Sequence, residues 1–185
     1  MSSDQSTIRK MTSRINGLCL ISSRADFNTK LMVANGIVMS KICYLIQLWG
    51  GCEGYLLHSL QVLMNRAARA VKGLSGYTST KRLMQSCRWL SVKQLVVYHT
   101  IIMIYKILQT GTPSYFFHRL STAHPTGQGS GLLAASGAVN LPRNSFWYRG
   151  ALDYNRIPAN IKSIPNITTF KVKLRQWVHQ NISLE

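Results

Sequence analysis

The pattern of apolar residues along the chain predicts a mainly helical fold. Apolar positions recur at spacings of three and four residues in most segments, which is the period of a helix with one buried face. We expect helices over 4–17, 27–47, 53–71, 79–86, 92–109, 113–120, 149–155 and 167–182. The segment 27–47 follows Asp26, a good N-cap, and is apolar on most faces, so we expect it to be the central buried helix, with Gly36 as its weak point.

A run of small residues interrupts this pattern and predicts the domain boundary. The sequence TGQGSG at 126–131 reads as a flexible linker, and it lacks the spacing and the following Lys-Ser or Lys-Thr of a phosphate-binding loop. We therefore expect a helical bundle over 1–120, a linker over 121–138 and a small lobe over 139–185. This lobe starts with an irregular stretch that has room for a strand or two, and it ends in an amphipathic helix.

The net charge of the chain bears most strongly on its function. The chain has 22 Lys+Arg against 5 Asp+Glu, a formal net charge of +17. Such a chain repels itself unless an anion neutralises it, and nucleic acid is the usual anion for a domain of this kind. An anionic membrane surface is the second choice. The most apolar window, 31–49, contains Asn35, Lys41 and Gln47, which disfavours a membrane span.

The basic residues predict three clusters on helices and one in the irregular tail. Lys and Arg can bind backbone phosphates without reading sequence, although each cluster could equally be an ordinary solvated face. In the tail, arginines alternate with Tyr148, and such a mixture can stack on unpaired bases; the alternative is that Phe146, Trp147 and Tyr148 pin the tail to the bundle. The candidate residues are Arg9, Lys10 and Arg14; Arg66, Arg69 and Lys72; Lys171, Lys173 and Arg175; and Arg143 with Arg149.

The residues that carry enzyme chemistry are sparse. The few acids are scattered, so a carboxylate pair for magnesium is not expected. The cysteines form no CxxC pair and no zinc-finger spacing, and the histidines are dispersed. We therefore expect no metal site, no cofactor, no small-molecule substrate and no catalytic residue. Cysteines of this kind read as reduced, which favours an intracellular location, in the nucleus or the cytoplasm.

Several short segments appear in the same order in one known family. They are LQVLMNRAAR (60–69), LSVKQL (90–95), MIYK (103–106), TPSYF (112–116), LPR (141–143), SFWYRGA (145–151), NRIP (155–158) and TFKVKL (169–174). With the Trp-Gly that closes 42–50, they resemble the region after the catalytic palm in reverse transcriptases of non-LTR (LINE-type) retrotransposons. The resemblance covers about residues 30–178.

This resemblance implies a thumb-like helical bundle and the segment that follows it. The fingers, the palm and the paired aspartates of the polymerase site have no counterpart in the sequence. In the family, the thumb holds the template–primer duplex by its backbone, so the resemblance implies a non-catalytic fragment that binds RNA or an RNA–DNA duplex. Two alternatives stay open: an RNA-directed DNA polymerase, as the family would suggest, and a small basic membrane-associated protein.

Overall fold

The chain folds into helices, and no strand occurs among the residues that the structure describes, so the expected mainly α fold is confirmed. The computed structural model describes residues 3–21, 24–44, 46, 50–51, 54–74, 76, 78–119 and 145–183. Its helical elements are α1 (Ser3–Ile21), α2 (Phe27–Ala34), the π-helical turn η1 (Asn35–Met39), α3 (Ser40–Cys43), α5 (Gly54–Lys72), α6 (Thr80–Cys87), α7 (Val92–Thr110), α8 (Ser114–Arg119), α9 (Phe146–Asn155), α10 (Ala159–Lys162) and α11 (Ile167–Asn181).

The helices belong to two compact units. Unit 1 contains α1, α2, η1, α3, α5, α6 and the start of α7 up to Leu95. Unit 2 contains the rest of α7 from Val96, together with α8, α9, α10, α11 and the short piece around Gly50. Residues 96–119 thus group with the C-terminal helices, whereas the sequence places them with the N-terminal bundle. The expected linker over 121–138 lies outside the described residues.

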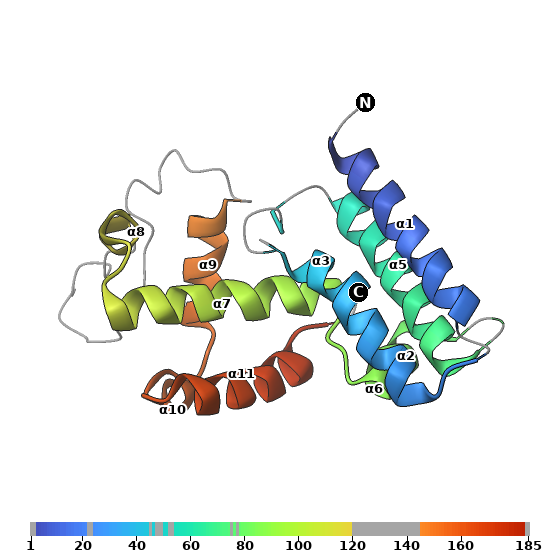
Figure 1. The fold of residues 1–185 in the computed structure, drawn as a ribbon. Helices are drawn as coiled ribbons and strands as arrows, with labels where there is room; N and C mark the ends of the chain where they lie inside the picture. The colour runs from blue at the N-terminus through green and yellow to red at the C-terminus, as the bar shows by residue number, and fades with distance from the viewer. Residues whose placement is uncertain are drawn as a thin grey trace. The chain divides into compact units, whose positions relative to one another are not determined.

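Unit 1 is built around α5, against which α1, α2 and α6 pack (Figure 1). The apolar stripe of α5 is buried as its spacing predicts, at Leu60, Leu63, Met64, Ala67 and Val71. The helix ends where the sequence turns to glycine: Gly73 has a φ of +65°, a conformation that other residues adopt only at a cost.

The expected helix over 27–47 forms from Phe27 to Cys43 with a π-helical turn at its middle, but one of its sides is exposed, so it is not the central buried helix. Asp26 caps α2 as predicted, with its carboxylate accepting the amide protons of Asn28 and Thr29. The path then widens into η1 around Gly36, and α3 ends where Tyr44 turns to an extended conformation. Met32 is 69% exposed, so this segment lies at the surface of unit 1 with one side buried.

Helix α7 is the most enclosed helix of unit 2. Residues on nearly every side of it are buried, including Ile101, Ile102, Ile104 and Ile107. Within unit 2 the helix α9 comes very close to α7, because a Cβ added to Gly150 would lie 2.6 Å from Ile104 Cδ1. The apolar face of α11 is buried as predicted, since Phe170, Leu174 and Val178 are each 0% exposed.

Other predicted boundaries shift by a few residues. Helix α1 continues through Gly17 to Ile21, and α8 begins at Ser114, one residue after the proline expected at its first position. The sequence allowed a strand over 139–148, but α9 already begins at Phe146, because the Ser145 side chain caps it by accepting the amide proton of Tyr148. Residues 139–144 lie outside the described part of the chain.

Candidate nucleic-acid interface

The basic cluster predicted on α1 is divided between two sides of that helix. Successive residues of a helix are rotated by about 100°, so Arg9 and Lys10 face different directions. Lys10 and Arg14, one turn apart, share the side next to η1, where Arg14 Nη1 donates to the Ile37 carbonyl at 3.2 Å. Arg9 is exposed and lies two turns before Asn16, on the same stripe of α1.

The cluster predicted on α5 is divided in the same way. Arg66 turns toward α1 and donates from Nη2 to Asn16 Oδ1 at 2.8 Å. Lys72 turns toward α2 instead, with its ammonium 4.2 Å from the centre of the Phe27 ring, a cation–π contact. Arg69 lies one turn after Arg66, half-buried, on the side of α5 away from the core.

Helical periodicity and the packing of α1 on α5 put three arginines on adjoining sides of the two helices, a basic surface that the sequence does not present as one cluster. We call Arg9, Arg66 and Arg69 the α1–α5 face. The hydrogen bond from Arg66 of α5 to Asn16 of α1 links the two helices and holds the Arg66 guanidinium in this face. Val62, 48% exposed, lies one turn before Arg66 and adds an apolar surface beside the charges.

The predicted cluster on α11 also falls on two sides. Lys171 and Arg175 are one turn apart, whereas Lys173 is rotated by about 200° from Lys171. Burial lowers the pKa of His99 in α7 below its ordinary value of 6.5, and the positive charge of Lys171 lowers it further. Burial raises the pKa of Tyr98, and the positive charge of Arg175 opposes that rise.

Arg149 has an internal partner in unit 2. Its Nη1 donates to the Gly50 carbonyl at 2.6 Å, and its charge also acts on the carboxylate of Asp153. We therefore leave Arg149 out of the interface that the sequence proposed for it. Arg143, the other candidate of the tail, lies outside the described residues.

The aromatic residues of α9 act mainly in packing. Phe146 is buried, and the Trp147 ring lies 4.8 Å from the ring of Phe116 in α8. Tyr148 is half-buried. This arrangement supports the alternative in which these aromatic residues pin the tail, and it leaves little aromatic surface there for stacking on bases.

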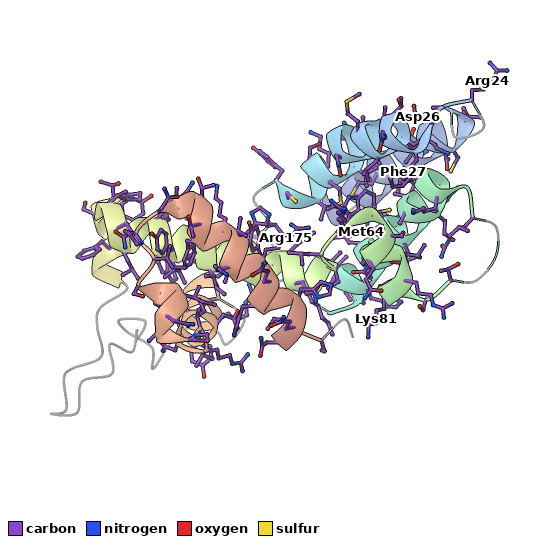
Figure 2. All side chains as sticks on the ribbon, turned by 90° about the horizontal axis from the view of Figure 1, so that it is seen from below. Arg24, Asp26, Phe27, Met64, Lys81 and Arg175 are labelled. Carbon is purple, nitrogen blue, oxygen red and sulfur yellow. The ribbon has the colours of Figure 1, made fainter. Side chains whose placement is uncertain are left out.

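Some exposed cations were not singled out in the sequence. Lys81 and Arg82 lie on the outer side of α6, and Figure 2 shows Lys81 pointing away from the helix. Figure 2 also shows Arg24 projecting away from the start of α2. The signal was present: α6 buries Leu83 and Met84, so basic residues off that stripe must face outward.

The acidic residues with described side chains are both used in local structure. Asp26 caps α2, and the hydroxyl of Thr29, followed by its amide, lowers the pKa of that exposed carboxyl. Asp153 pairs with Arg156, its Oδ1 lying 3.5 Å from Nη1, while burial raises its pKa. Neither carboxylate lies on α1, α5 or α11, so neither offsets the candidate cations on their own helices.

Two further features of the described residues bear on the alternatives. No three His, Cys, Asp or Glu side chains among them gather closely enough to hold a metal ion. Within the same part of the chain, every helix is too short or too polar to traverse a bilayer.

Comparisons with known proteins identify no relative. No family model matches the sequence, and neither a curated protein nor a solved structure matches it.

Proposed function

We propose that this chain is a non-catalytic nucleic-acid-binding fragment that grips the backbone of RNA or of an RNA–DNA duplex with its α1–α5 face. The role would be like that of the thumb in the reverse transcriptases that the sequence resembles. Its setting would be the nucleus or the cytoplasm, where such partners occur. The proposal needs no cofactor, because the phosphate contacts come from side chains alone.

The observation that carries the proposal is a positive charge that the chain cannot neutralise itself. Even if each of the 5 acidic residues paired with one cation, the excess of 17 positive charges would stay. An external polyanion offsets such an excess, and each bound phosphate releases condensed counterions, which makes binding favourable at low salt.

The geometry of the α1–α5 face supports a backbone grip. Arg9 and Arg66 come from two packed helices, and the hydrogen bond to Asn16 holds the Arg66 guanidinium in place. A guanidinium held in this way loses less side-chain entropy when it binds a phosphate. Arginine also suits phosphate because its planar fork can donate two parallel hydrogen bonds.

The test is the salt dependence of binding to a labelled RNA–DNA duplex, followed by fluorescence anisotropy. The variant Arg9→Gln/Arg66→Gln/Arg69→Gln should bind more weakly, and the slope of log K against log salt should fall by about 0.9 for each phosphate that the variant no longer neutralises. The matched control removes the same charge from exposed positions elsewhere in unit 1 by changing three lysines to glutamine: Lys41, Lys81 and Lys93.

Equal losses of affinity in the two triple variants would show that only net charge matters, and would refute the assignment to the α1–α5 face. Absence of a complex at low salt from folded protein would refute nucleic-acid binding itself. Binding to anionic vesicles in place of the duplex would favour the membrane-associated alternative. Primer extension with Mg²⁺ should give no product, and clear extension would favour the polymerase alternative.

A further inference from the structure

One end of the packed pair α7 and α11 carries a cavity of about 500 Å³. Tyr105, Lys106 and Gln109 of α7 line one side, and Pro165 and Ile167 at the start of α11 line the other. This volume is in the range of small-molecule pockets. Thr110 and Thr112 complete the lining, which thus combines apolar surface with the ammonium of Lys106 and further polar residues. Apolar surface suits a flat ring, and the ammonium suits a negative charge beside it.

The wall of the cavity is held firmly. The Tyr105 hydroxyl donates to the carbonyls of Ile164 at 2.6 Å and Pro165 at 2.9 Å. Its ring stacks on Phe170 with the ring centres 3.9 Å apart. A ligand entering the cavity would therefore meet a preorganised surface, which reduces the entropy lost on binding.

Cations and aromatic rings continue from the cavity along α7 and α11. Lys171 follows Ile167 by one turn, and Arg175 follows by two, which places Arg175 about 12 Å along the helix from the cavity. The charge of Lys171 contributes to the lowered pKa of His99, and the charge of Arg175 opposes the raised pKa of Tyr98. These two cations of α11 therefore lie near the facing side chains of α7.

Tyr98 and His99 themselves form an edge-to-face pair with ring centres 5.3 Å apart. Each is half-exposed, so part of each ring can be reached by a ligand. Aromatic rings bordered by cations are the surface on which unpaired bases stack while their phosphates are neutralised. We call Tyr98, His99, Lys106, Lys171 and Arg175 the α7–α11 seam.

We propose that the α7–α11 seam binds a short unpaired stretch of nucleic acid, with one base in the cavity beside Lys106 and the adjoining phosphates on Lys171 and Arg175. The inference rests on the proposed function only in taking nucleic acid as the partner. It adds a second site, selective for single strands, because the bases of a duplex are stacked on each other and cannot enter the cavity.

The experiment measures the affinity of the full chain for an unstructured labelled oligonucleotide and for the RNA–DNA duplex. Lys171→Gln should weaken binding of the single strand about fivefold, since it removes a phosphate contact. Lys173→Gln is the matched control, because it makes the same change on the same helix but on the other side, and it should stay within about twofold of wild type.

A second pair tests the cavity. Gln109→Glu places a negative charge at the cavity and should weaken single-strand binding about fivefold, because it repels the phosphates. Gln176→Glu makes the same change at an exposed position of α11 away from α7 and should have little effect. Circular dichroism confirms that each variant is folded.

The outcomes separate this inference from the proposed function. If Lys171→Gln and Lys173→Gln weaken single-strand binding equally, or if Gln109→Glu leaves it unchanged, the α7–α11 seam is not the site, even when duplex binding depends on the α1–α5 face. If the duplex does not bind while the single strand binds through Lys171 and Gln109, the proposed function fails and the seam stands.

Discussion

Replacement of Arg149 by methionine should destabilise unit 2 without changing nucleic-acid binding. Methionine keeps an unbranched apolar stem of similar length but cannot donate to the Gly50 carbonyl, which Arg149 Nη1 meets at 2.6 Å. A hydrogen bond from a charged group contributes about 1.5–3 kcal/mol, and the buried Gly50 would lose that partner. We therefore expect the free energy of unfolding to fall by about 2 kcal/mol.

Thermal unfolding followed by circular dichroism measures this effect. For a chain of 185 residues, a loss of this size corresponds to a decrease in Tm of roughly 4–8 °C. Arg156→Met is the matched control, since it removes the same charge from the same carboxylate neighbour, Asp153. The Arg156 side chain is 66% exposed and its ion pair is 3.5 Å long, so its removal should cost less than about 1 kcal/mol.

Two results would contradict this reasoning. An Arg149→Met variant as stable as the Arg156→Met control would show that the bond to Gly50 contributes little. The second result is a loss of affinity for the duplex or the single strand in Arg149→Met alone, with stability unchanged. It would show that Arg149 contacts nucleic acid, as the sequence suggested.

Four other substitutions test the packing and the electrostatics. Gly50→Ala should destabilise by about 1–3 kcal/mol, because its Cβ would lie 2.6 Å from the Ile46 carbonyl oxygen, whereas Gly17→Ala, with nothing within 4 Å, should stabilise α1 by up to about 1 kcal/mol; urea unfolding compares them. The free energy of unfolding should fall as the pH drops below 6.5, because the lowered pKa of His99 makes the unfolded chain bind this proton more readily, and His99→Gln should flatten that part of the pH profile. Tyr105→Phe should cost about 0.5–1.5 kcal/mol in thermal unfolding, since it loses the bonds to the carbonyls but keeps the stacked ring; an unchanged Tm would refute the role of the hydroxyl.

Helix type and buried faces could be predicted where one apolar stripe dominates. The stripe of α5 and that of α11 are both buried, because a helix with one apolar face has a single way to remove that face from water. For the segment 27–47, the helix was predicted correctly but its burial was not, because no single apolar stripe marks one buried face. Apolar residues on many faces predict burial on every side, yet the helix contains a π-helical turn around Gly36, ends before the extended Tyr44 and leaves Met32 exposed.

The candidate site was less predictable, because residues that are close in sequence point in different directions on a helix. The separation of Lys171 from Lys173 follows from helical geometry alone. That Arg66 and Arg9 belong to one surface depends on the packing of α1 against α5, which no local sequence pattern reveals. The same holds for Arg149, whose partner Gly50 is 99 residues away in the sequence.

The burial of α1 has a practical consequence for how the protein can be shortened. Met11, Ile15 and Leu18 are no more than 2% exposed, so α1 belongs to the core of unit 1 and is not a detachable basic arm. A fragment that starts after residue 22 would leave the facing side of α5 uncovered, and an apolar strip of that kind promotes self-association. Deletion of α1 is therefore expected to make the protein precipitate, so such a deletion cannot test the role of the basic residues of α1.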